Sequence, residues 1–197
     1  MAERRRGRPR DESINVAILD ATVDEMIDKG MDGMSMEGIA ARAGVAKTTV
    51  YRRWSAIDEL CIAAICRLDS AVEAVEPSGE TVRDELLAHL ERMRRKWTND
   101  RYGAVMRRAA ADAAANPELY ASARARIVGP HIAAMNRTLQ RAVDEGVIRS
   151  DVDLDWVRQL LVAPVLAATM TLKTRVSRAQ LEFTLDTVLG GLAPGPD

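Results

Sequence analysis

Apolar residues recur in this chain at intervals of three and four, the spacing that places side chains on one face of a helix. The first run contains Ile14, Ile18 and Met26, and Gly30 ends it in the way that a glycine commonly ends a helix. Alternation with a period of two is scarce, and glycine and proline fall mostly between the apolar runs. The pattern therefore predicts an all-α protein.

Two short helices are predicted directly after the first. Ser35 is a candidate N-cap for a helix of about eight residues that stops at Gly44, and a third helix begins at Lys47. Helices this short are unstable alone, so we expect them to pack across the first helix. The spacing of Ala40, Gly44 and Val50 is typical of a helix-turn-helix, although a plain corner of a helical bundle stays open on this evidence.

The third predicted helix, up to Trp54, carries polar and cationic side chains and no carboxylate. With Val50 and Trp54 facing inward, its outer face and flanks hold six residues suited to a DNA groove. They are Lys47, Thr48, Thr49, Tyr51, Arg52 and Arg53. Arginine reads guanine edges, and hydroxyls and lysine hold phosphates. A solvated helix face usually mixes charges of both signs, so this face favours DNA.

Charge is distributed in blocks, although the formal net charge is only −1. Five arginines and Glu3 give residues 1–10 a net charge of +4, whereas Lys29 and eight acids give residues 11–41 a charge of −7. Residues 42–54 carry +4 without an acid, and Arg42 belongs to this second cationic block. Such local blocks decide whether a surface attracts phosphate, so Arg42 is a further candidate DNA contact.

The N-terminal arm contains Arg6-Gly7-Arg8-Pro9, which resembles the core of an AT-hook. Pro9 keeps the chain extended and Gly7 lets the backbone approach the floor of an A·T minor groove. Arg6 and Arg8 are therefore predicted DNA contacts. The alternative is a disordered basic tail that adds only non-specific attraction.

The stretch IAARAGVAKTTVYRRW, together with ILDATVDEMIDKG and SMEG before it, resembles the DNA-binding domain of the tetracycline-repressor (TetR) family of transcriptional regulators. The resemblance is close over residues 14 to about 60 and extends to the rest by general layout. It implies a three-helix reading head whose third helix enters the major groove. Ile57 stands where the family often has a lysine, which puts a phosphate contact there in doubt.

The remaining pattern predicts a helical body that begins at residue 57. Its expected helices cover 57–75, 81–98, 101–115, 117–145, 153–175 and 178–192. Asp153 is a candidate N-cap, and Pro164 should kink the helix that contains it. The expected domains are a disordered basic arm over 1–10, a helix-turn-helix domain over 11–56, and a ligand-binding and dimerisation domain over 57–197.

The last two predicted helices are more apolar than one chain is expected to bury. In the family this pair forms a four-helix dimer interface across a two-fold axis. The residues predicted for that interface are Leu161, Val165, Ala168, Leu181, Leu185, Val188 and Leu189. An ordinary monomer core is the alternative.

The resemblance also implies a small-molecule pocket between the middle helices. Candidate lining residues are Met93, Trp97, Met106, Met135, Leu139, Thr169 and Met170, although such residues are more often simply core. Because few charged residues fall at core spacing, we expect a small, largely apolar effector.

Other classes of protein find little support. The chain has two histidines, His89 and His131, and no glycine-rich phosphate loop, so no catalytic, metal or cofactor site is predicted. Cys61 and Cys66 point to different faces of one helix, and no apolar run reaches the length of a membrane span, so a cytoplasmic protein is expected. The hypothesis is a dimeric repressor that binds a palindromic operator and is released by an effector. The alternative is a sequence-tolerant architectural DNA-binding protein without a ligand.

Overall fold

The computed structural model describes residues 8–72, 79–115, 117–172 and 174–195, in which the regular secondary structure is entirely helical. The all-α prediction is confirmed. The elements in chain order are α1 (Arg8–Gly33), α2 (Met36–Arg42), α3 (Lys47–Tyr51), α4 (Ile57–Val72), α5 (Val82–Thr98), α6 (Asp100–Asp112), α7 (Pro117–Ile127), α8 (Gly129–Asp144), α9 (Leu154–Leu166), the π-helix η1 (Ala167–Leu172) and α10 (Arg178–Leu192). Within these ranges no helix is both long and apolar enough to cross a membrane.

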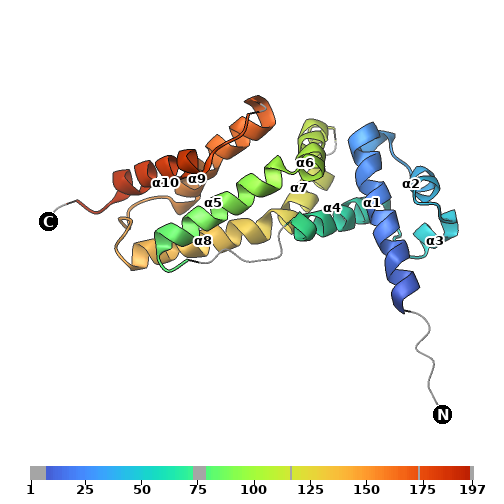
Figure 1. Cartoon of the computed structure of the whole chain (residues 1–197), viewed down its shortest axis with the longest axis horizontal. Helices are drawn as coiled ribbons and strands as arrows, with labels where there is room; N and C mark the ends of the chain where they lie inside the picture. Colours follow the sequence, from blue (N-terminus) through green and yellow to red (C-terminus); the bar gives the residue numbers. More distant parts are fainter. Residues whose placement is uncertain (1–7, 73–78, 116, 173, 196–197) are drawn as a thin grey trace, which may run out of the picture.

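The molecule is elongated, with α1, α2 and α3 at one end and α9 and α10 at the other (Figure 1). Helix α4 leads from this head into the body. Buried apolar residues of the described ranges form two clusters. One joins the head to α4, α6 and the end of α7, and the other fills the body between α5, α8, α9 and α10. Head and body therefore share a core at α4 and α6.

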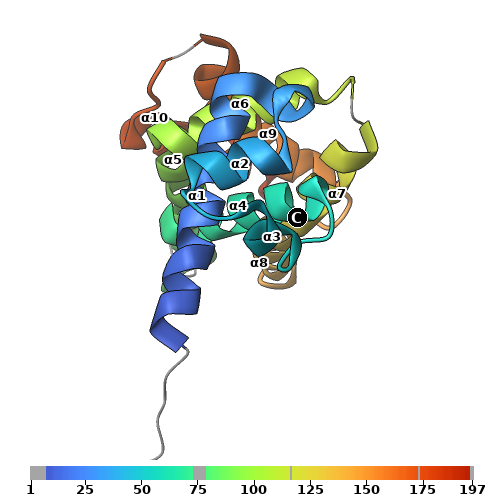
Figure 2. The ribbon, with the colours of Figure 1, turned by 90° about the vertical axis from the view of Figure 1, so that its right-hand side faces the viewer.

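The head is built as its sequence pattern predicts. The Ser35 hydroxyl accepts a hydrogen bond from the Gly38 N–H at 3.1 Å, which caps α2. Gly44 has φ of +66° in the turn between α2 and α3, a conformation that favours glycine. Val50 is fully buried and anchors α3 against the head core. In Figure 2 these two short helices lie across α1 at the free end of the molecule.

Helix α1 differs from the expectation at both ends. It begins at Arg8, inside the segment expected to be a disordered arm, and Asp11 in the first turn stabilises that start through the helix dipole. At the other end Gly30 breaks the helical geometry with φ of +72°, and a last short turn continues to Gly33.

Two expected helices are divided in the structure. The single helix predicted over 117–145 is wrong, because α7 ends at Ile127 and α8 starts afresh at Gly129. Pro130 lacks an N–H group and cannot continue a helix, but it fits the first turn of a new one. The helix predicted over 153–175 also changes form after Pro164. The α-helical part ends at Leu166 and widens into η1.

Candidate nucleic-acid interface and ligand cavity

Helix α3 presents its polar side chains at the free end of the head. Lys47, Thr48, Tyr51 and Arg52 are exposed, whereas Thr49 is half-buried beside the buried Val50. The ammonium group of Lys47 lies over the Tyr51 ring, 5.8 Å from its centroid. The outward orientation predicted for the centre of the helix therefore holds, while contact with DNA stays a prediction.

Glu37 on α2 brings a carboxylate to this face, which the sequence of α3 alone did not indicate. The Lys47 Nζ atom lies 2.7 Å from Glu37 Oε1, and the Tyr51 hydroxyl donates a hydrogen bond to the same oxygen at 3.2 Å. The hydrogen bond from Lys47 lowers the pKa of Glu37, so this carboxylate stays ionised at neutral pH. In the free protein, Glu37 occupies donors that could otherwise bind phosphate.

Arg53 is directed inward and holds α1 against the end of α3. Its Nε donates to the Asn15 side chain at 2.5 Å, and its guanidinium pairs with Asp11, so its side chain is only 12% exposed. These contacts favour a positioning role for Arg53 over the reading role predicted for it.

Arg42 joins α2 to α1 through two carboxylates. It contacts Glu25 at 2.8 Å and Asp28 at 2.7 Å, and Glu25 is almost completely buried. Hydrogen bonding to Asp28 raises the pKa of the Arg42 guanidinium. Of the two arm residues, Arg6 lies outside the described part of the chain, and for Arg8 only the start of α1 is described.

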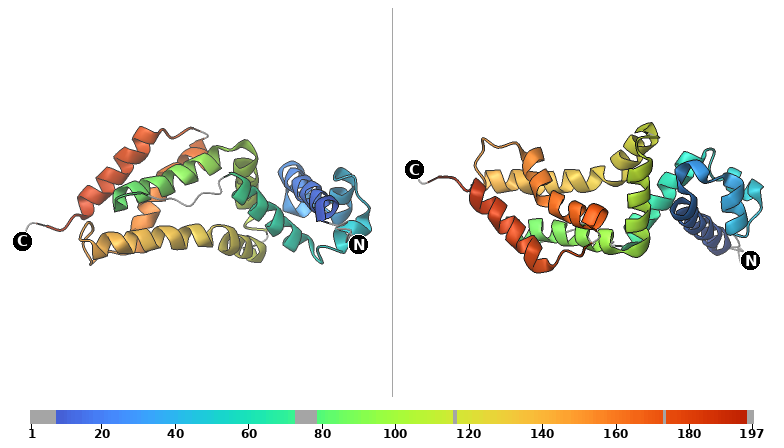
Figure 3. Two further views of the ribbon diagram at one scale, coloured as in Figure 1. Left: turned by 60° about the horizontal axis from the view of Figure 1, so that its bottom comes forward. Right: turned by 90° about the horizontal axis from the view of Figure 1, so that it is seen from above.

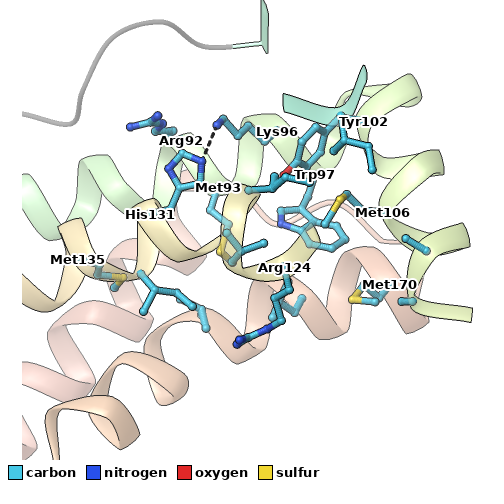
Figure 4. A pocket seen from close by; sticks show the side chains of 18 of the residues that line it. Arg92, Met93, Lys96, Trp97, Tyr102, Met106, Arg124, His131, Met135 and Met170 are labelled. Atoms are coloured by element: carbon cyan, nitrogen blue, oxygen red, sulfur yellow. Dashed lines mark hydrogen bonds between the residues drawn. The ribbon is translucent and has the colours of Figure 1, made fainter. Parts of the chain in front are cut away.

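A cavity of about 240 Å³ lies inside the body, lined by side chains from each helix between α4 and η1. Five of the seven predicted lining residues face it, namely Met93, Trp97, Met106, Met135 and Met170 (Figure 4). The other two predictions are wrong. Leu139 is fully buried in the core of the body, and the Thr169 hydroxyl bonds back to the Val165 carbonyl at 2.7 Å instead of lining the cavity.

Sequence reasoning missed a buried charged cluster at one side of this cavity. Lys96 and Asp69 are 4% and 9% exposed, and Lys96 Nζ lies 2.7 Å from Asp69 Oδ1. His131 Nε2 lies 3.0 Å from the other Asp69 oxygen and 3.2 Å from Lys96 (Figure 4). The cluster links α4, α5 and α8. The sequence could have indicated this cluster, because Lys96 lies three positions after Met93 and therefore on the same helix face.

The surroundings of Asp69 and Tyr102 shift the pKa of each group. Burial alone would raise the pKa of Asp69, but hydrogen bonds from His131 and Lys96 outweigh burial and hold that pKa below its usual value. Burial raises the pKa of the nearby Tyr102 hydroxyl, so tyrosine stays neutral. Its ring meets Trp97 edge to face, with centroids 6.1 Å apart. A rigid, neutral aromatic pair therefore adjoins an ionised carboxylate.

Helix α6 connects the cavity to the head. Met106 faces the cavity, while Arg101 on the same helix reaches α1. Arg101 donates to the Asp24 side chain at 2.8 Å and to the Asp20 carbonyl at 3.1 Å. Near the other end of α6, Asp112 accepts a hydrogen bond from the Met31 N–H at 3.1 Å. A displacement of α6 by a molecule in the cavity would therefore act on the middle and the C-terminal end of α1.

The apolar stripe predicted as the dimer interface faces inward, so that assignment is corrected. All its members except Val188 are buried within the chain, and Leu161, Val165 and Leu185 have no exposed surface. Val188 is half-buried beside them. They pack against α5 and α8, the neighbours that the sequence alone did not identify.

Three large apolar residues of the same two helices are exposed on their outer side. Phe183 is 74% exposed and Trp156 58%, and Leu160 is exposed between them along the chain. Small residues such as Ala163 lie exposed on the same helix as Trp156. Helices α9 and α10 lie at the end of the molecule opposite the head (Figure 3).

The chain matches two family models. Residues 18–64 match "Bacterial regulatory proteins, tetR family", and residues 76–188 match "Tetracyclin repressor-like, C-terminal domain". Together they cover the head from Ile18, the first half of α4, and the body from residue 76 to Val188 in α10.

Curated relatives are transcriptional regulators. The chain is 29% identical over 185 residues to the "DNA-binding transcriptional repressor TetR" of Mycobacteroides abscessus, covering 91% of this chain and 94% of that protein. It is 31% identical over 144 residues to the HTH-type transcriptional regulator Mb1581 of Mycobacterium bovis, with 73% of this chain and 70% of the other covered.

A solved structure agrees in fold. The transcriptional regulator FadR of Bacillus subtilis, solved with stearoyl-CoA, has a TM-score of 0.69 over 90% of this chain and 98% of its own, at 17% identity.

Replacing Glu37 by glutamine should strengthen binding to duplex DNA. The change removes a negative charge near phosphate and releases Lys47, so we expect about two- to fivefold tighter binding, the range of an exposed ion pair. Fluorescence anisotropy with a labelled duplex at 50 and 200 mM salt measures it, with the distant, exposed Glu118→Gln as control. Unchanged or weaker binding by the Glu37 variant would contradict this role.

Replacing Asp69 by asparagine should destabilise the protein by about 3 kcal/mol at pH 7, because it leaves Lys96 buried without its counter-ion. A carboxylate whose pKa is lower in the folded than in the unfolded protein stabilises the fold at pH values above its unfolded pKa. That stabilisation is lost as the pH falls through the folded pKa. The deficit should therefore shrink as the pH falls below the ordinary value of 3.8. Urea unfolding at pH 7, 5 and 3.5 measures it, with the exposed Asp144→Asn as control. A variant as stable as the wild type at pH 7 would remove the cluster's structural role.

Proposed function

The chain belongs to the TetR family of DNA-binding transcriptional regulators, and we propose that it is a dimeric repressor released from its operator by a small effector. The observation that carries this proposal is the placement of the cavity. Helix α6 lines it with one face and holds α1 of the reading head with other side chains. A mere architectural protein would need no cavity connected to its reading head.

In this proposal α3 reads the major groove. Its centre exposes Thr48, Tyr51 and Arg52, which combine hydroxyl groups, an aromatic ring and a guanidinium able to bond guanine bidentately. Lys47 binds phosphate once DNA draws it away from Glu37. Arg42 and Arg53 fix the three head helices relative to one another, because each holds carboxylates of α1.

Dimerisation uses the outer face of α9 and α10. Trp156, Leu160 and Phe183 expose apolar surface that pairing with a second copy would bury, and exposed Ala163 would let two helices approach closely. Two copies related by a two-fold axis form a four-helix contact and carry two heads. Two reading helices then meet successive major grooves about 34–36 Å apart.

Effector binding shifts the dimer between two arrangements of its heads. Ile65 of α4 and Met106 of α6 both line the cavity, and both helices pack on α1. An effector that fits the arrangement whose head spacing does not match the operator shifts the population toward that arrangement. A preference of about 1.4 kcal/mol for that arrangement changes the operator affinity tenfold. The repressor named among the relatives and the acyl-CoA complex of the FadR neighbour support this scheme.

Selection of random duplexes by the purified protein, followed by sequencing, tests the function. We expect a two-fold palindrome with half-sites about one helical turn apart. Arg52→Ala should relax base preference at one position in each half-site by about 1–3 kcal/mol, whereas Arg137→Ala on α8 should change nothing. Enrichment of A·T-rich duplexes without a palindrome would instead support the architectural alternative.

Replacing Phe183 by aspartate should weaken the dimer, because it places a charge in the apolar contact. Sedimentation equilibrium should show at least a tenfold rise in the dissociation constant, since burying an unpaired charge costs several kcal/mol. Ala133→Asp, an exposed position on α8, should leave the dimer intact. Equal dimer stability in both variants would place the interface elsewhere.

A further inference from the structure

Charge on the cavity lining is of one sign, although most of the lining is apolar. Arg92, Lys96, Arg124 and Arg158 line it together with the two histidines, and no carboxylate does so among the described residues. The expectation that few charged side chains reach this site was therefore wrong. Helical spacing did not identify the three arginines, because their long side chains can reach the cavity from the edges of the apolar stripes.

Most of these cations have partners within the protein. Lys96 and His131 share Asp69 behind the lining. Arg158 is held on the far side, where its guanidinium donates to Asn136 at 3.0 Å and contacts Asp155 at 3.2 Å. Arg92 is engaged as well.

Arg124 is different, because its guanidinium forms no ion pair or hydrogen bond with any residue in the described ranges. It lies on α7 among the lining residues Tyr120, Ala123 and Ile127, and in Figure 4 its side chain is directed away from the Lys96–His131 pair. The side chain is exposed, so its guanidinium is accessible to a ligand. A planar guanidinium in this position is suited to bind a carboxylate through two parallel hydrogen bonds.

We propose that the effector is a small apolar molecule with a single carboxylate-like anionic group, and that Arg124 binds this group. The inference deepens the proposed function, on which it rests. The apolar body lies among Met93, Met106, Met135 and Met170, whose flexible thioether side chains adapt to irregular shapes. A volume of about 240 Å³ is slightly below the range of roughly 300–1,000 Å³ for drug-sized ligands, which limits the effector to a smaller molecule.

The sign of the charge favours an anionic effector over cationic and neutral ones. A cationic ligand would meet arginine and lysine side chains with no lining carboxylate to receive it. A neutral apolar ligand would gain the methionine contacts but nothing from Arg124. An anion gains both, because a hydrogen bond between charged groups is shorter and stronger than one between neutral groups.

Matched probes test the inference. Octanoate, octan-1-ol and octylammonium share one skeleton, and 2-naphthoate, 2-naphthol and 2-naphthylmethylammonium share another. Isothermal titration at pH 7.5 measures the affinity of each for the wild-type protein, for Arg124→Gln and for Arg126→Gln. Arg126 is the matched control, because it is exposed on the same helix but does not line the cavity.

At least one carboxylate should bind the wild type about tenfold or more tightly than its matched alcohol and amine, as expected for one charge-assisted contact. Arg124→Gln should remove that preference and leave alcohol binding unchanged, while Arg126→Gln should retain it. Equal affinity within each series, a preference for the amines, a preference that survives in Arg124→Gln, or no saturable binding of either carboxylate would overturn the inference. A carboxylate that binds through Arg124 without releasing the selected operator would leave the inference intact and count against effector-controlled repression.

Discussion

A reading helix of five residues cannot fold by itself, and the rest of the structure follows from that constraint. Helix α3 gains its stability from Val50, which is buried in the core that α1, α2 and α4 share. Helix α1 depends in turn on α4 and α6, and both of those helices line the cavity. The position of the reading helix is therefore not independent of the body. Helices α6, α1 and α3 are joined through packed side chains, without a linker between them.

The cavity combines two demands that conflict in an ordinary core. Methionine side chains form part of its lining, and the ionic cluster of Lys96, Asp69 and His131 lies at one side of it. Apolar residues of similar size would often stabilise a protein better than a buried ion pair does. The cluster instead joins α4, α5 and α8 beside the cavity through hydrogen bonds of defined geometry. Lys96 and His131 both contact Asp69, whereas the guanidinium of Arg124 has no such partner among the described residues.

The two faces of α9 and α10 illustrate a limit of periodicity. An amphipathic pattern identifies an apolar stripe, and both helices have apolar side chains on more than one side. The stripe with the stricter spacing, including Leu161 and Leu185, is the intramolecular one. The bulky residues outside that spacing, Trp156 and Phe183, are those left exposed. Burial depends on which neighbours α5 and α8 present, and periodicity contains no information about neighbours.

The sequence by itself determined the local features: the all-helical class, the Ser35 cap, the glycine turn at Gly44 and the outward face of α3. Each depends on interactions within a few residues, which propensity and capping rules describe. Only the tertiary structure decided which charges meet. Glu37 and Lys47 are ten positions apart and Asp69 and His131 sixty-two, so their pairing follows from packing angles between helices. The same reason applies to Arg124, because whether an arginine is paired depends on the acids that other helices bring within reach.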